Sequence, residues 1–448
     1  MKIFKHNQFR LNFTYKVYFL IFLGLNLTLL MPSIISNVIQ HDDYNFFRLN
    51  NHSKFFLTHP QAIYGYYFGR PIQSLLVDFF AVLFPYIGFN GLRLIGAILF
   101  SSCATRIYFC VNSVSSNKNT GLFIAFSFCL LPGTIFSELL LVAIPFSVAI
   151  LFALESGRLI NSKTLVCSEN KLPLFLLILS FLTYQPASVM FFFYPFIKQI
   201  HNGLNCKEAC SRLFIFLSAA FVYFLSVKFV SEPFLLKHFP GDSHVISSSS
   251  PYVTQLASNP GIIIEKFIRV IKTSLSFFFP AGKVNYFGYL ILLPLFFNIY
   301  LKSKNILRSL FYTSGIIIFI TFVFSLPILA AKNSLIFFRT TNYVTLAFIA
   351  LGMVMIEKIG ITLKKNLNIL KFCIISSMFL SSFWLAYSSA SFTNSEYISF
   401  KYAHQNSLSY VPNTSKVIND EFYMPITSTE LAEKRIAEEI SGFHNFIK

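Results

Sequence analysis

The chain has 448 residues, of which 55% are hydrophobic, 18% are aromatic and only 12% are charged. Soluble domains carry about 25% charged residues, so this composition excludes an ordinary soluble enzyme and indicates a membrane protein. The net charge of +18 does not indicate nucleic-acid binding, because the basic residues are scattered in short loops between apolar runs.

Apolar runs recur along the whole chain and are long enough for helices that cross a bilayer, which takes about 20 residues. They lack the polar face that a helix of a soluble protein presents to water. The first run follows a basic leader, as a secretory signal peptide does, but it is long for such a peptide and has no clear cleavage site. We therefore expect a retained helix. The plainest runs are 17–36, 213–230, 286–301, 310–329 and 369–386.

The distribution of lysine and arginine predicts the topology, because cytoplasmic loops of membrane proteins are enriched in these residues. The N-terminus carries a basic leader and is expected inside. The other segments expected inside are the loop at Lys118 and the stretches 158–171, 198–212, 302–308 and 358–371.

We therefore expect an all-α fold, a polytopic transmembrane helical bundle of about eleven crossings. The bundle would span residues 1–390, with external loops at 40–90, 231–279 and 331–342. Residues 391–448 have ordinary polarity and would form a small C-terminal tail on the external side. This tail is too short for a robust core of its own.

The stretch 71–111 is expected to break within its length. It is long enough for two helices, yet the chain must cross an odd number of times before the inside loop at Lys118. We expect 71–86 to lie along the outer interface and 91–111 to cross, with the break at Gly88-Phe89-Asn90-Gly91.

The stretch 172–197 is flanked on both sides by basic loops. It must therefore leave and return on the same side, and we expect a short hairpin that turns near Tyr184-Gln185-Pro186. Tyr184 and Gln185 could also serve only to satisfy backbone groups that Pro186 frees.

The seven cysteines fall in predicted helices or inside loops, so no disulfide framework is expected. His201, Cys206 and Cys210 would offer three zinc ligands, but a tetrahedral structural site needs a fourth ligand at a matching spacing. A solvated loop is the better interpretation. We predict neither a metal site nor a cofactor.

Charge beside the outer face is richest in the first external loop. Asp42 and Asp43 follow the first helix directly, and an aromatic-rich segment with Arg48 leads on to Gly69-Arg70-Pro71. A carboxylate there could take a proton from a sugar hydroxyl, and the cations could hold a lipid-linked phosphate. An acidic pair at a helix exit is otherwise explained as interfacial decoration.

These residues resemble a known family. A single helix, followed by an acidic pair in a large first external loop, is similar to the pattern of the GT-C superfamily of membrane glycosyltransferases. The closer resemblance is to the serotype-converting O-antigen glucosyltransferases of Gram-negative bacteria. It covers the chain in order and topology, and its short motifs are specific only in combination. They are Asp42-Asp43-Tyr44 with Arg48, Gly69-Arg70-Pro71, Gly91-Leu92-Arg93-Leu94, Tyr184-Gln185, and Arg339 in the loop 332–342.

One segment departs from the pattern. Between the third and fourth helices the resemblance leads us to expect an external segment with a tyrosine and an aspartate, and this chain has Phe136-Ser137-Glu138. Glu138 would have to supply the acceptor contacts in their place. As a structural residue it would be an ordinary helix-end group.

The resemblance implies a glycosyltransferase of the bacterial inner membrane. It would move a sugar, glucose in the family, from undecaprenyl phosphate to O-antigen or lipopolysaccharide on the periplasmic side. The N-terminus would be cytoplasmic and the C-terminus periplasmic. The enzyme would work with a separate lipid-sugar synthase and a flippase, and would bind no nucleic acid.

The resemblance also assigns roles to residues. Asp42 or Asp43 would be the general base on the acceptor hydroxyl. Adjacent helical residues point about 100° apart, so the two aspartates are expected to differ in role. The residues implied in substrate binding are Arg48, Arg70, Glu138, Tyr184, Gln185, Lys332 and Arg339.

Two other classes stay open. An O-antigen polymerase also acts on lipid-linked sugars, but would place its catalytic residues in large later external loops. A lipid-linked oligosaccharide flippase or other transporter would show two related halves and charges deep in its spans. Arg93 and Arg106 are expected here only to extend to the outer and inner interfaces.

Overall fold

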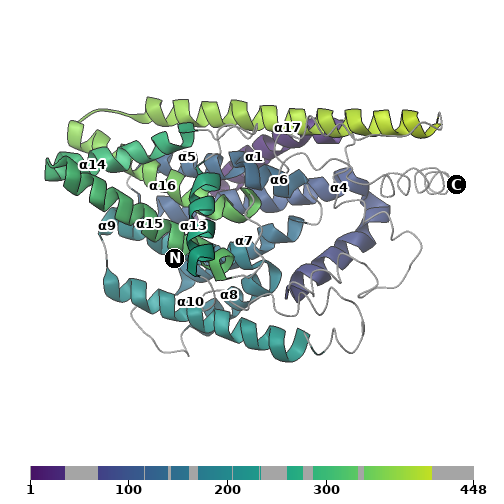
Figure 1. Ribbon diagram of the computed structural model, residues 1–448, viewed down its shortest axis with the longest axis horizontal. Helices are drawn as coiled ribbons and strands as arrows, with labels where there is room; N and C mark the ends of the chain where they lie inside the picture. The colour runs from purple at the N-terminus through teal and green to yellow at the C-terminus, as the bar shows by residue number, and fades with distance from the viewer. Residues whose placement is uncertain are drawn as a thin grey trace.

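A computed structural model describes residues 2–35, 69–115, 117–139, 143–160, 170–203, 205–231, 233, 260–275, 286–330 and 338–405. Every regular element in these ranges is helical (Figure 1). In chain order they are α1 (Lys2–Ile35), α4 (Pro71–Asn112), α5 (Lys118–Leu130), α6 (Pro132–Leu139), α7 (Ile144–Leu159), α8 (Lys171–Thr183), the 3₁₀-helix η4 (Gln185–Phe192), α9 (Phe193–Asn202), α10 (Cys206–Ser226), the π-helical turn η5 (Val227–Ser231), α13 (Pro260–Ser274), the 3₁₀-helix η7 (Tyr286–Leu292), α14 (Leu293–Ser303), α15 (Ile306–Ala330), α16 (Phe338–Leu363) and α17 (Asn368–Gln405).

The protein is a helical membrane protein, as its composition predicts. Within the described ranges, five helices are long and apolar enough to cross a membrane. Several shorter apolar helices accompany them, and the total of about eleven crossings stays a prediction. The five are Thr14–Ile35, Asn90–Asn112, Cys206–Ser231, Ile306–Leu329 and Thr340–Leu363; the shorter ones are Pro71–Leu83, Lys171–Thr183, Gly288–Ser303 and Asn368–Trp384.

Helix α16 is the central helix of the bundle, and α10 lies at its edge. In the most apolar window of each, 83% of the α16 residues are buried but only 22% of the α10 residues. Small residues let neighbouring backbones approach α16: a Cβ on Gly352 would lie 2.7 Å from the Ile291 carbonyl oxygen, a contact typical of membrane helix packing. Phe214 and Phe221 of α10 are exposed, which places them against lipid.

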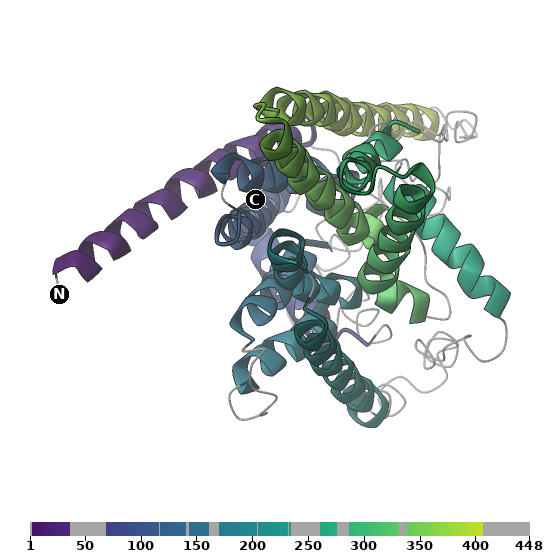
Figure 2. The ribbon, with the colours of Figure 1, turned by 90° about the vertical axis from the view of Figure 1, so that its left-hand side faces the viewer.

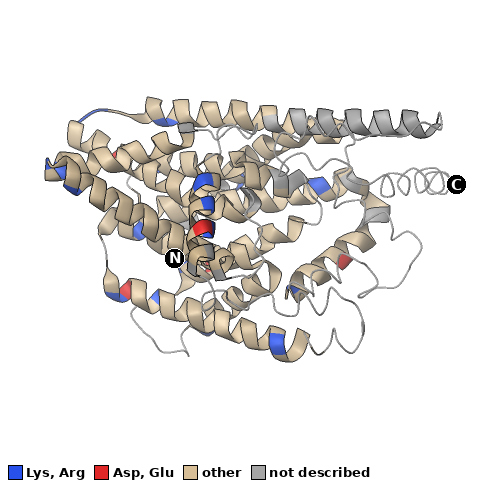
Figure 3. Cartoon of the chain, in the orientation of Figure 1, with Lys and Arg blue, Asp and Glu red and all other residues tan. Residues whose placement is uncertain are grey.

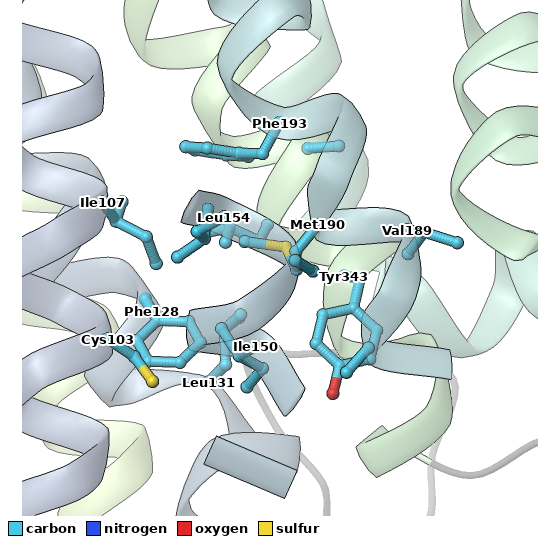
Figure 4. Close-up of a cluster of buried hydrophobic side chains, with 14 of the residues drawn as sticks. Cys103, Ile107, Phe128, Leu131, Ile150, Leu154, Val189, Met190, Phe193 and Tyr343 are labelled. Atoms are coloured by element: carbon cyan, nitrogen blue, oxygen red, sulfur yellow. The ribbon is translucent and has the colours of Figure 1, made fainter. Parts of the chain in front are cut away.

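The core around α16 is formed by side chains from several helices. Figure 4 shows Tyr343 of α16 beside Ile150 of α7 and Met190 of η4, with Phe193 of α9 nearby. All four side chains are almost fully buried. Helix α7 and η4 can pack this closely because Gly157 has no side chain: a Cβ there would lie 2.1 Å from the Phe191 carbonyl oxygen.

Helix α4 breaks where the sequence predicts. Gly88 has φ 63° and ψ −172° inside it, a conformation that glycine adopts without steric cost. The break separates the short helix Pro71–Leu83 from the span Asn90–Asn112. The placement of the first part along the outer interface stays a prediction.

A helix break is also present at Tyr184, where a hairpin turn is predicted; the hairpin itself stays a prediction. Helix α8 ends at Thr183, and Tyr184 is extended with φ −157° and ψ 103°. Pro186 favours a break here, because it has no N–H with which to continue the hydrogen bonds of α8, and it is tolerated in the first turn of η4. The chain then continues in η4 and α9, so the segment after Tyr184 is a buried 3₁₀-helix before it becomes α-helical.

Four of the basic turns expected inside lie at one end of the bundle. Figure 3 shows segments coloured blue for lysine and arginine at the α9–α10, α14–α15 and α16–α17 turns, all on its left. Lys358 of α16 donates to the carbonyl of Ile200 on α9. The turn before α5 is joined to the same place, because Thr120 donates to Glu357 of α16 at 2.6 Å.

This basic end contains a buried polar cluster. Lys371 of α17 is 1% exposed and its Nζ donates to Thr120 Oγ1 at 2.7 Å. Ser115 Oγ also donates to the Glu357 carboxylate, at 3.1 Å. Burial lowers the pKa of the nearby His201 imidazole, which Lys358 and Lys371 lower further and Glu357 opposes. Thr120 thus joins the starts of α5 and α17 to the end of α16.

Three elements differ from expectation. The loop 231–279 contains helix α13, whose Val270 is buried against the bundle. Helix α16 begins at Phe338, so the end of the predicted loop 331–342 is helical. Helix α17 runs past residue 390 to Gln405 without a glycine or proline to end it, and is the long upper helix of Figure 1. The rest of the tail lies outside the described residues.

The expectation for Arg93 is wrong. Its side chain is fully buried between α4 and α1, and Nη1 donates to the Ser33 carbonyl at 3.0 Å. Asn26 of α1 and Ser101 of α4 add a second polar contact at 2.9 Å. Polar contacts between the helices are available here, so Arg93 joins the two spans and its guanidinium is not exposed. Figure 2 shows the N-terminal part of α1 extending away from the bundle.

Candidate functional site

The structure describes three of the predicted site residues in full: Arg70, Tyr184 and Gln185. Of the others, Glu138 lies in α6 and Arg339 in the first turn of α16, and only their backbones are described. The predictions that lie outside the described residues are Asp42, Asp43, Arg48 and Lys332.

The three described residues lie together, although they come from segments more than 100 positions apart. Arg70 Nε donates to Gln185 Oε1 at 2.7 Å. The Arg70 Cζ atom lies 4.8 Å from the centre of the Tyr184 ring, within the range of a cation–π contact. The guanidinium is therefore held in its plane by an amide and over one face by an aromatic ring.

Local sequence explains how Arg70 is presented. It precedes α4, and Pro71 begins that helix, where its missing N–H costs no hydrogen bond. Gly69 before it has φ 67°, which favours glycine. Gln73, in the first turn of α4, accepts from Arg70 Nη1 at 3.5 Å. The turn thus directs the guanidinium towards η4.

Tyr184 connects the guanidinium to the core. Its ring stacks on Phe146 of α7, with ring centres 3.6 Å apart and planes 6° apart. The Tyr184 side chain is 2% exposed. Because the backbone at Tyr184 is extended, the direction of this side chain does not follow the helical repeat of α8. Arg70 thus stacks on Tyr184, and Tyr184 stacks on Phe146. This stacking restricts the orientation of the Arg70 side chain.

Sequence reasoning missed Tyr223, the fourth member of the cluster. Gln185 Nε2 donates to Tyr223 Oη at 2.7 Å, and Tyr223 Oη donates to the Gly69 carbonyl at 3.0 Å. Tyr223 lies near the end of α10 and is 3% exposed. It is one tyrosine among 22 in the chain, within an apolar run, and no local signal distinguished it.

Helices α6 and α16 meet near this cluster. Asn342 Nδ2 of α16 donates to Thr134 Oγ1 of α6 at 2.9 Å. Glu138 lies one turn after Thr134, and Arg339 lies one turn before Asn342. Helix α16 also packs against η4, and Figure 4 shows the next residue, Tyr343, beside Met190 of η4. The backbones of Glu138 and Arg339 are thus on helices that meet close to η4, the element that contains Gln185.

A metal-binding cluster is not found among the described residues, in which no three histidine, cysteine or acidic side chains gather. Cys206 and Cys210 of α10 are exposed free thiols. The contacts of the described cluster suit two roles: a site that binds an anion, or a set of contacts that only holds neighbouring helices together. An oriented guanidinium binds phosphate oxygens in two parallel hydrogen bonds, which is the functional interpretation.

The structural interpretation is that Arg70 only ties the start of α4 to η4 and α10. Both interpretations use the same contacts and differ in whether a ligand binds. No family model, no curated protein and no solved structure matches this chain.

Proposed function

We propose that this protein is a GT-C-like membrane glycosyltransferase that moves a sugar, glucose by the resemblance, from undecaprenyl phosphate to O-antigen or lipopolysaccharide. One observation supports the proposal above the others. Arg70, Tyr184 and Gln185, chosen from two separate motifs, form one hydrogen-bonded and stacked cluster. The acidic pair Asp42 and Asp43 precedes that cluster in the same predicted loop.

Arg70 is suited to the phosphate of the lipid donor. Its guanidinium is half-buried, and the hydrogen bond to Gln185 fixes its plane. A planar, charged fork of this kind pairs with phosphate oxygens better than a lysine does. It would stabilise the negative charge that grows on the phosphate as the sugar leaves.

The transfer step then follows from the predicted roles. The oxygen of an acceptor hydroxyl attacks the anomeric carbon of the donor sugar, and its proton passes to Asp42 or Asp43. The bond from that carbon to the phosphate oxygen breaks, and the electron pair leaves with undecaprenyl phosphate. Glu138, Arg48, Lys332 and Arg339 would contact the substrates.

The proposed setting is the bacterial inner membrane, with chemistry at its periplasmic face. Four basic turns lie at one end of the bundle, and positive loops face the cytoplasm. Arg70 directly precedes α4, and the turn that follows the far end of α4 lies at that basic end. The donor would be made and flipped by separate proteins.

The test is the structure of the surface polysaccharide in cells that carry the gene, lack it, or carry Arg70→Ala. We expect a sugar branch that depends on the gene and that Arg70→Ala removes at normal protein abundance. Arg158→Ala is the matched control, since Arg158 is an exposed arginine that pairs with Glu155 at the other end of the bundle. A polysaccharide that is the same with and without the gene contradicts the proposal.

A further inference from the structure

Tyr223 contributes a hydroxyl group, not only a ring, to the cluster around Arg70. Its ring stacks with Phe181 of α8, with centres 5.5 Å apart, and a phenylalanine could make that contact. Its Oη atom, however, is the partner of both the Gln185 amide and the Gly69 carbonyl. A buried hydroxyl with two partners is costly to remove, because both partners lose a hydrogen bond.

In the hydrogen bonds of the cluster, the donor and acceptor atoms can be assigned in only one way. A guanidinium can only donate, so the Gln185 oxygen must face Arg70 Nε. The amide nitrogen of Gln185 then faces Tyr223 and donates to Oη, which leaves the hydroxyl hydrogen for the Gly69 carbonyl. Gln185 Nε2 also donates to the Gly69 carbonyl at 3.5 Å, so Tyr223 supplies the shorter of these two restraints on the amide that holds Arg70.

The backbone before Arg70 is shaped to receive this hydroxyl. A Cβ at Gly69 would lie 2.7 Å from Tyr223 Oη and 3.0 Å from Val227 Cγ2. No other residue has room there, and the positive φ of Gly69 favours glycine independently. Val227 begins the π-helical turn η5, an irregularity that is frequent at functional sites.

We propose that Tyr223 is a positioning residue that holds Arg70, through Gln185, in the orientation that binds a polyprenyl phosphodiester. The identity of the ligand rests on the proposed function. The positioning of Arg70 rests only on the contacts above. Tyr223 acts on Arg70 through two hydrogen bonds and is not itself a substrate contact.

The first experiment measures positioning without any ligand. Phenylglyoxal modifies guanidinium groups, and peptide mass spectrometry of the full-length protein in detergent gives the rate at Arg70. We expect Tyr223→Phe to raise that rate several-fold, because the Gln185 amide loses its 2.7 Å hydrogen bond and keeps the longer one to the Gly69 carbonyl, so that it holds Arg70 less firmly. Tyr108→Phe is the control, a buried tyrosine near the other end of α4. An unchanged rate in Tyr223→Phe, with thermal unfolding like that of wild type, overturns the proposal.

The second experiment measures binding of undecaprenyl phosphate in a double-mutant cycle. Tyr223→Phe should weaken binding about tenfold in the wild-type background and have no further effect in Arg70→Ala. Additive losses would mean that Tyr223 does not act through Arg70. If wild type binds no undecaprenyl phosphate, the assigned ligand class is wrong, and the phenylglyoxal rates still decide whether Tyr223 positions Arg70.

Discussion

At the scale of single residues, two short motifs contain residues that the structure brings together. Arg70 and the pair Tyr184-Gln185 were candidates for substrate binding, and they lie together. Tyr223 was not predicted, because an apolar run contains no sign of which tyrosine has a buried partner. The Tyr223 hydroxyl donates to the carbonyl of Gly69, which lies 154 positions earlier in the chain. Only the folded structure brings these two groups together.

The acidic pair gives a prediction at this scale. Asp42→Asn and Asp43→Asn should both insert normally, because an amide costs no more than a carboxylate at the interface. At least one should lower sugar transfer by about 100-fold, the usual contribution of a general base. Transfer to the O-antigen acceptor is measured with membranes that contain equal amounts of each variant. Full activity in both variants would remove the aspartates from the mechanism.

At the scale of elements, both helix breaks were predictable and the polar contacts between helices were not. Gly88 and Pro186 have local conformational effects that depend on their own residue types. Arg93 was expected at the interface and is buried against α1. An arginine side chain can find hydrogen-bond partners either at the membrane interface or at a carbonyl on another helix. For Arg93, only the packing of α1 on α4 decides between the two.

The buried cluster at the basic end gives a prediction at this scale. Lys371→Met removes the cation whose Nζ contacts Thr120, beside the buried Glu357 carboxylate. We expect a loss of about 2–3 kcal/mol in the free energy of unfolding, since a buried charge is left with less compensation. Unfolding of the purified protein in detergent measures it.

Two further variants control this measurement. Lys365→Met changes an exposed lysine in the turn between α16 and α17 and should change stability by less than about 0.5 kcal/mol. Adding Glu357→Gln to Lys371→Met should recover part of the loss, because the buried charge is then removed. Equal stability of Lys371→Met and Lys365→Met would show that the cluster does not join these helices energetically.

At the scale of the whole molecule, the structure groups the basic turns at one end and leaves the membrane side to be tested. Cysteines introduced at Ser53 and Ser395 should react with an impermeant external thiol reagent in intact cells. Those at Ser116 and Ser303 should react only after the cells are permeabilised, since positive loops face the cytoplasm. Reaction of Ser116→Cys in intact cells would add a crossing to 71–111 and reverse the assignment of the basic end.

The sequence by itself determined the class of protein, the breaks in its helices and the grouping of its charges. These depend on transfer of side chains into lipid and on the backbone preferences of glycine and proline, which are properties of the residues themselves. Only the tertiary structure decided that Tyr223 supports Arg70, that Arg93 joins α1 to α4, and that α16 is the central helix. Every span is apolar enough for lipid, so hydropathy cannot tell which faces pack against protein. That choice depends on close packing and on hydrogen-bond partners far away in the chain.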